Sequence, residues 1–184
     1  MLAWKPVRAL RVLDFDIETV AAGFADPEWV PQKVTCIAWS WIGERAVEVR
    51  TRLDDPGAML CDFHEEYDRA DMVTGHNVIR FDLPVLNSEC LRMHFVSLGA
   101  KLCQDTIRIV KTKGFKKGQD NIGHLLKLSA QKKALSWQQW QDAYEEDEWA
   151  TVKERCASDV RQHKLMREEM LRRGWLKPPR MWQP

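Results

Sequence analysis

The 184-residue chain has an ordinary globular composition, with 45% hydrophobic and 30% charged residues and a formal net charge of +1. Its length is typical of one domain, so we expect a single domain over 1–184, with a core at about 8–173 and a loosely held tail at 174–184. The near-neutral charge excludes a polycation. Any contact with nucleic acid must therefore come from local charged patches.

The cysteines and the apolar runs bear on the cellular compartment. The cysteines are odd in number and widely spaced, and they include no C-x-x-C pair. This pattern argues against a zinc knuckle and a disulfide framework, and for a reducing compartment. No apolar run is long enough to span a membrane, and no signal-peptide pattern is present. We therefore expect a cytoplasmic protein that makes no membrane contact.

Hydrophobic alternation and turn residues predict an α/β fold with a mixed sheet. The expected strands, of which the second and third form a hairpin, cover 8–17, 34–42, 46–51 and 71–74. The expected helices run from Asp54 or Asp55 to about Tyr67, from about Phe81 to Met93, and over 106–111, 121–128 and 148–172. A long loop is expected over 20–33, and loops of this length often close over a substrate.

Two carboxylates are predicted to lie side by side on the first strand. Alternation along the strand places Phe15 and Ile17 on one face, and Asp16 and Glu18 on the other. Two negative charges about 4 Å apart repel by roughly 1 kcal/mol in water, and by several kcal/mol at a protein-like dielectric. A divalent cation with oxygen ligands relieves that repulsion. The residues therefore indicate a metal-dependent enzyme that acts on phosphates.

Two further acids occupy informative positions. Asp82 lies in the first turn of a helix that directly follows a short strand, which is where α/β sheets place ligands. Asp159 lies midway along the long C-terminal helix, and its small neighbours Ala157 and Ser158 permit a close approach to the sheet. Both acids are candidates to complete a site with Asp16 and Glu18.

Three motifs in this order resemble those of the 3′–5′ exonuclease superfamily with a ribonuclease H-like fold, which includes polymerase proofreading domains and separate DNA and RNA exonucleases. The motifs are Asp16-x-Glu18, Asn77-x-x-x-Phe81-Asp82 and Cys156-Ala157-Ser158-Asp159-Val160, with support from Asp105-Thr106 and Asn121-Ile122-x-x-Leu125-Leu126. The likeness covers roughly 8–173. It implies a mixed five-stranded sheet flanked by helices. It also implies that two Mg²⁺ or Mn²⁺ ions are held by the catalytic residues Asp16, Glu18, Asp82 and Asp159.

The resemblance implies hydrolysis at the 3′ ends of nucleic acid, with single-stranded DNA favoured, and release of nucleoside 5′-monophosphates. Two ions about 3.5–4 Å apart can clamp the attacking and leaving oxygens and lower the pKa of the attacking water. An RNA exonuclease of the same family stays an alternative, because sugar selectivity depends on contacts near the 2′ position. A weakly active or inactive nucleic-acid-binding module is a second alternative. Any replication or repair partner would act in trans.

One position departs from the family's pattern. The family has a Tyr four residues before the last Asp or a His five residues before it, whereas this chain has Arg155 and Glu154. A guanidinium stays protonated and cannot act as a base, but it can pair with a site carboxylate or hold the scissile phosphate. A missing acid–base helper typically costs about 10²–10⁴ in rate. His163 and Tyr144 are candidates to substitute, although a packing or surface role is the favoured interpretation of His163.

Substrate contacts are expected from a basic stretch and from residues beside the motifs. Basic residues outnumber acids over 108–133, and segment 111–118 suits a mobile loop on a phosphate backbone with Phe115 stacking on a base. A solvated basic loop explains the same pattern. For Asn77 and Phe81, a turn cap and a core position are equally good interpretations. The predicted substrate-binding residues are Thr19, Asn77, Phe81, Lys113, Phe115, Lys116 and Arg155.

Overall fold

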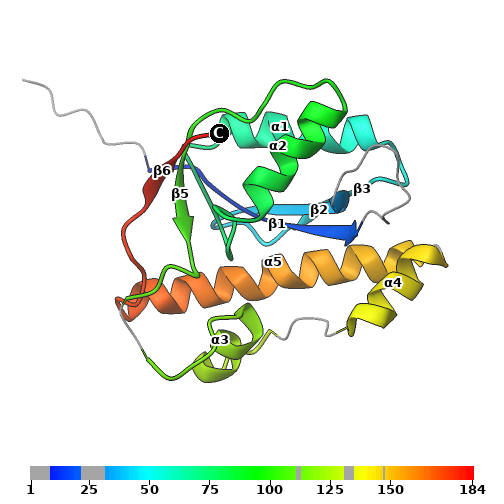
Figure 1. The fold of residues 1–184 in the computed structure, drawn as a ribbon. Helices are drawn as coiled ribbons and strands as arrows, with labels where there is room; N and C mark the ends of the chain where they lie inside the picture. Colours follow the sequence, from blue (N-terminus) through cyan, green and yellow to red (C-terminus); the bar gives the residue numbers. More distant parts are fainter. Residues whose placement is uncertain (1–8, 22–31, 111–112, 131–134, 147) are drawn as a thin grey trace, which may run out of the picture.

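A mixed six-stranded sheet forms the centre of the molecule (Figure 1). The computed structural model describes residues 9–21, 32–110, 113–130, 135–146 and 148–184. The strands lie in the order β3-β2-β1-β4-β5-β6, with β1 (Val12–Ala21), β2 (Gln32–Trp41), β3 (Glu48–Thr51), β4 (Met72–Gly75), β5 (Lys101–Asp105) and β6 (Arg180–Trp182). Because β1, β4 and β5 run parallel, their carboxyl ends share one edge of the sheet.

Helices cover both faces of this sheet. On one face lie α1 (Pro56–Arg69) and α2 (Asp82–Arg92), and the long α5 (Trp149–Arg172) crosses the other (Figure 1). Two shorter helices, α3 (Gln119–Leu126) and α4 (Trp137–Glu145), pack against α5. Within the described part of the chain, no helix combines the length and the apolar character needed to cross a bilayer. The predicted α/β class is thus confirmed.

The main core lies between the sheet and the pair α1 and α2. Leu13, Phe15 and Ile17 of β1 are buried there against Phe63 and Tyr67 of α1. The rings of Phe15 and Phe63 have centroids 5.0 Å apart. Burying side chains of this size contributes about 1.5–3 kcal/mol each. Because this face of β1 is committed to the core, Asp16 and Glu18 must face α5.

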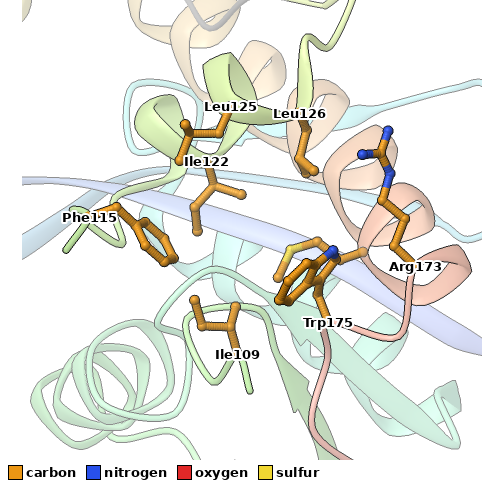
Figure 2. Close-up of a pocket in the computed structure, with 8 residues that line it drawn as sticks. Ile109, Phe115, Ile122, Leu125, Leu126, Arg173 and Trp175 are labelled. Atoms are coloured by element: carbon orange, nitrogen blue, oxygen red, sulfur yellow. The ribbon is translucent and has the colours of Figure 1, made fainter. Parts of the chain in front are cut away.

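A smaller apolar cluster lies between α3 and α5. It contains Ile109, Ile122, Met166 and Met170, with Phe115 packed against it. Part of this cluster borders the pocket drawn in Figure 2. The cluster anchors α3 to the carboxyl-terminal half of α5.

Elements with strong local signals form close to their predicted bounds. The predicted hairpin is the antiparallel pair β2 and β3. Helix α1 begins where the Asp55 side chain accepts hydrogen bonds from the backbone N–H groups of Gly57 and Ala58. The predicted C-terminal helix is α5, and Gly174 follows it in the left-handed conformation, with φ of 69°.

Several sequence expectations about the fold are wrong. The pattern predicts a helix over 106–111, but a turn and an isolated bridge between Ile109 and Leu176 follow β5. The resemblance implies five strands, and the structure has six, because 180–182 of the predicted loose tail pair with β5 as β6. The buried Trp182 ties this strand to the core. The sequence patterns did not indicate β5 or α4.

Both ends of the predicted loop over 20–33 belong to strands instead, because β1 extends to Ala21 and β2 begins at Gln32. Residues 22–31, for which the sequence left open closure over a substrate or an ordinary surface loop, lie outside the described residues.

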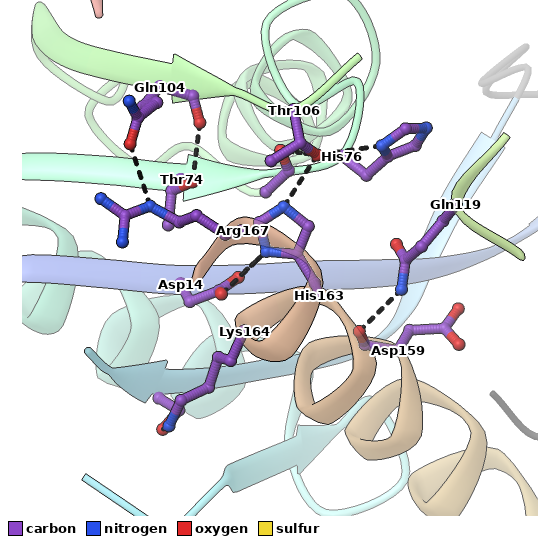
Figure 3. Close-up of polar contacts among 12 residues, drawn as sticks. Asp14, Thr74, His76, Gln104, Thr106, Gln119, Asp159, His163, Lys164 and Arg167 are labelled. Carbon is purple, nitrogen blue, oxygen red and sulfur yellow. Dashed lines mark hydrogen bonds and ion pairs between the residues drawn. The ribbon is translucent and has the colours of Figure 1, made fainter. Parts of the chain in front are cut away.

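A buried polar network joins α5 to the sheet (Figure 3). Nδ1 of His163 lies 2.8 Å from both carboxylate oxygens of Asp14, and its Nε2 lies 2.9 Å from Oγ1 of Thr106. The Thr106 hydroxyl also lies 3.0 Å from Nδ1 of His76. Asp14 and His163 are only 0% and 2% exposed. Because both ring nitrogens of His163 are engaged within this network, the favoured packing role fits its position.

We expect His163→Leu to destabilise the protein by about 3–5 kcal/mol, because it leaves the buried Asp14 carboxylate without its partner. Urea unfolding followed by circular dichroism measures the change. The double variant Asp14→Leu with His163→Leu should recover much of the loss, since it removes the stranded charge. A double variant no more stable than His163→Leu would show that the stranded charge is not the cause.

Candidate metal centre

The candidate site lies where the middle of β1 faces the middle of α5. The pairing of β1 with β2 shifts register between Glu18 and Thr19. Such irregularities re-aim side chains and are frequent beside active sites. Asp159 approaches from α5, flanked by the buried residues Ala157 and Ser158. The small neighbours thus lie where the sequence analysis expected a close approach of the helix.

Three carboxylates meet at this point. Asp16, Glu18 and Asp159 each contribute an oxygen, and these oxygens lie within 4.8 Å of one another. Asp159 is buried, whereas Asp16 and Glu18 are half-buried. Carboxylate oxygens are hard ligands that suit Mg²⁺ or Mn²⁺. The cluster can therefore bind a divalent metal ion.

Asp82 lies beside this cluster, outside the set of three. It is the first residue of α2, and its Oδ1 accepts a hydrogen bond from the backbone N–H of Ile17 at 3.3 Å. Burial raises the pKa of Asp82 to about 7, and the charges of Asp105 and Glu18 act in the same direction, against the backbone hydrogen bonds that lower it. The fourth predicted ligand is thus adjacent to the cluster, and its contact with a metal stays a prediction.

Arg155 brings a positive charge to the cluster. Its Nε donates a hydrogen bond to Oε1 of Glu18 at 2.6 Å, and the two side chains are only 16% and 13% exposed. Burial lowers the pKa of Arg155, but the charges of Glu18, Asp159 and Asp16 outweigh it, so the pKa lies above its usual value. The prediction that this arginine can pair with a site carboxylate is confirmed. Glu154 instead pairs with Arg161 at the surface.

Side chains that the sequence analysis did not single out support the cluster. Nε1 of Trp140 in α4 donates a hydrogen bond to the Thr19 carbonyl at 3.1 Å. Nε2 of Gln119 in α3 donates to the Asp159 carbonyl at 2.8 Å (Figure 3). No sequence spacing reveals these contacts. The capping box of Ser136 and Gln139 could have revealed α4, and with it the placement of Trp140.

The structure shows other contacts for several of the remaining predicted substrate-binding residues. Asn77 has a φ of 68° in the turn after β4, where its backbone N–H donates to Oδ1 of Asp105 at 2.8 Å. Phe81 packs against the main core, in agreement with its interpretation as a core residue. Phe115 is half-buried, and Lys113 and Lys116 are exposed. Their contacts with substrate stay predictions. The side chain of Tyr144 lies outside the described residues.

Comparison with known proteins supports the fold. No protein-family model and no curated protein matches the sequence. Among solved structures, the family B DNA polymerase from the hyperthermophilic archaeon Pyrobaculum calidifontis is similar, with a TM-score of 0.63 and 20% sequence identity. The match covers 89% of this chain and 25% of the polymerase, so the chain spans a quarter of that protein's length. The α/β fold is compatible with the ribonuclease H-like fold.

The raised pKa of Asp82 predicts that the metal-free protein loses stability as pH rises. Its folded-state pKa of about 7 exceeds the ordinary value of 3.8, so the unfolded chain releases this proton first. Ionisation of Asp82 therefore disfavours the folded state progressively between about pH 4 and pH 7. Asp82→Asn keeps an oxygen acceptor for Ile17 and removes the charge. It should be more stable than the unmodified protein by roughly 2–4 kcal/mol at pH 8, and by less at pH 5.

Urea unfolding in chelator at the two pH values measures this difference. A stability gap that is the same at pH 5 and pH 8 would contradict the assignment to the Asp82 charge.

Proposed function

We propose that this chain is a metal-dependent exonuclease that hydrolyses phosphodiester bonds from the 3′ end of single-stranded nucleic acid, with DNA preferred. The observation that carries the proposal is the convergence of Asp16, Glu18 and Asp159 on one point of an α/β sheet. The likeness of the fold to part of a DNA polymerase agrees with it. The 3′–5′ direction and the release of nucleoside 5′-monophosphates come from the resemblance of the motifs.

The donor set fits hard divalent cations. Mg²⁺ or Mn²⁺, two ions in this proposal, would be held by Asp16, Glu18 and Asp159, with Asp82 adjacent, and would supply Lewis acidity and an activated water. Without a cation the acids repel one another, and the ion pair between Arg155 and Glu18 offsets only part of that repulsion. The remaining negative charge attracts a cation to the site.

Arg155 has a distinct part in this proposal. Its guanidinium cannot accept a proton at ordinary pH, so it does not replace a Tyr or His that positions water. Guanidinium groups bind phosphate oxygens through charge-assisted hydrogen bonds. We assign Arg155 to the scissile phosphate, next to the Glu18 carboxylate that holds it in place.

A cleavage assay tests the proposal directly. DNA and RNA, single- and double-stranded and labelled at the 3′ or the 5′ end, are incubated with Mg²⁺, Mn²⁺ or chelator. We expect stepwise shortening of single-stranded DNA from its 3′ end, with nucleoside 5′-monophosphates released only when metal is present. Asp16→Asn and Asp159→Asn should abolish cleavage, because each removes a ligand charge from the cluster.

Glu65→Gln is a matched control, because Glu65 is exposed on α1, across the sheet from α5. This variant should cleave at the rate of the unmodified protein. Cleavage that persists in chelator, or in Asp159→Asn, would refute the proposal. Faster cleavage of RNA than of DNA would favour the RNA exonuclease alternative.

A nuclease-like binding module without catalytic activity is the alternative of a different class. The observation that favours it is Arg155, whose charge already neutralises part of the cluster in the structure. In such a module the arginine would take the place of the metal. The two functions therefore differ in whether the folded protein binds a divalent cation.

Manganese should stabilise the unmodified protein, because a ligand that binds only the folded state adds about 2.7 kcal/mol at 100 times its Kd. Arg155→Met should be less stable without metal and should gain more from Mn²⁺, since the cation replaces the lost charge. Asp159→Asn should gain little. Thermal unfolding at increasing Mn²⁺ concentration measures these shifts. Oligonucleotide binding without any Mn²⁺ shift would favour the binding module.

A further inference from the structure

Two pockets away from the acidic cluster share one wall. The aromatic pocket, of about 240 Å³, is lined by Ile109, Phe115, Ile122, Leu126, Met170 and Trp175, among others. The basic pocket, of about 340 Å³, is lined by Arg80, Arg108, Ile109, Lys117, Lys177 and Arg180, among others. Ile109 belongs to both. The bridge between Ile109 and Leu176 holds the two lining segments together.

The aromatic pocket has the chemistry of a base-binding site. Figure 2 shows Phe115 and Trp175 on different sides of the pocket, with Ile109 below. Trp175 is 42% exposed and Leu125 is 60% exposed, so large apolar groups at this pocket remain in contact with solvent. Aromatic side chains of this kind stack on nucleobases of any sequence.

The basic pocket has the chemistry of a phosphate-binding site. Among the described residues, no carboxylate lies within ion-pair distance of Arg80, Arg108, Lys117, Lys177 or Arg180. The one acid in its wall, Asp105, already accepts hydrogen bonds from three backbone N–H groups, those of Asn77, Ile79 and Ile107. Five cations in a wall with a single acid create a local positive potential that attracts anions.

The same short pattern occurs on both lining segments. Phe115 lines the aromatic pocket, and Lys117, two residues later, lines the basic pocket. Trp175 and Lys177 repeat this arrangement on the segment that leads from α5 to β6. Each segment therefore offers a ring to one pocket and a cation to the other. We propose that the paired pockets bind one nucleotide unit, with its base in the aromatic pocket and its phosphates in the basic pocket.

The position of the paired pockets favours a nucleotide within a strand over a free nucleotide. Asp159 of the acidic cluster and Met170 of the aromatic pocket lie on the same helix, about 16 Å apart along its axis. A single nucleotide cannot reach both places, but a strand can. This step rests on the proposed function. On this basis the 3′ end of the strand enters the acidic cluster. The paired pockets then bind a nucleotide that lies further towards the 5′ end.

Binding of a fluorescent single-stranded DNA oligonucleotide in chelator tests the inference, because neither metal nor cleavage then contributes. Trp175→Leu should weaken binding roughly 5- to 100-fold, as expected for the loss of one stacked base. Arg108→Gln and Lys177→Gln should each weaken binding and lower the slope of log affinity against log salt by about 1. Trp175→Leu should leave that slope unchanged.

Arg45→Gln is the matched control, because Arg45 is exposed in the hairpin turn between β2 and β3 and loses the same charge. Equal melting temperatures verify that each variant is folded. Unchanged affinity in Trp175→Leu and Lys177→Gln would overturn the inference, even if the protein cleaves DNA. Weakened binding in both variants would support it, even if no cleavage is found.

A competition experiment with thymidine monophosphate and with inorganic triphosphate shows whether the ligand is a strand, a free nucleotide or a free inorganic phosphate. We expect the oligonucleotide to bind more tightly than either small molecule. A mononucleotide that binds as tightly as the strand would overturn the assignment to a strand.

Discussion

Mutual repulsion of the carboxylates within 4.8 Å of one another is the constraint that this fold overcomes. β1 cannot turn Asp16 and Glu18 away without exposing Phe15 and Ile17, because side chains alternate strictly along a strand. From the other side, the buried contact between His163 and Asp14 holds α5 against the sheet. Hydrophobic burial and this polar contact thus keep the acids together, so the geometry of the cluster follows from packing elsewhere.

Two features lower the negative charge at the cluster in the metal-free protein. Arg155 pairs with Glu18, and the raised pKa keeps the Asp82 carboxyl protonated to a higher pH than an exposed aspartate. The carboxylate charges raise the pKa of Arg155, whereas burial is the main cause of the raised pKa of Asp82, and both features oppose the entry of a cation. The charge of the carboxylates therefore explains why an arginine can occupy position 155, which the motif resemblance alone does not explain.

The sequence predicted the parts of the molecule whose signals are local. Alternation located β1 and its acids Asp16 and Glu18, and an acidic cap before a proline located α1. In contrast, β5 is a short strand of mixed polarity, and β6 exists only because the edge of β5 is available to pair with it. The order of the three motifs identified Asp159 as a candidate metal ligand. The contact of Trp140 with Thr19 joins segments too distant for any spacing to reveal.

The short strand β6 has two effects that depend on the same three residues. It pairs with β5 and thereby replaces the five-residue edge of β5 with an edge of only three residues, and a shorter open edge is a weaker template for association between molecules. It also fixes the segment that carries Trp175 and Lys177. Detachment of β6 would therefore free the longer edge of β5 and dismantle the paired pockets in a single event, which links pairing between molecules to the loss of the proposed ligand site.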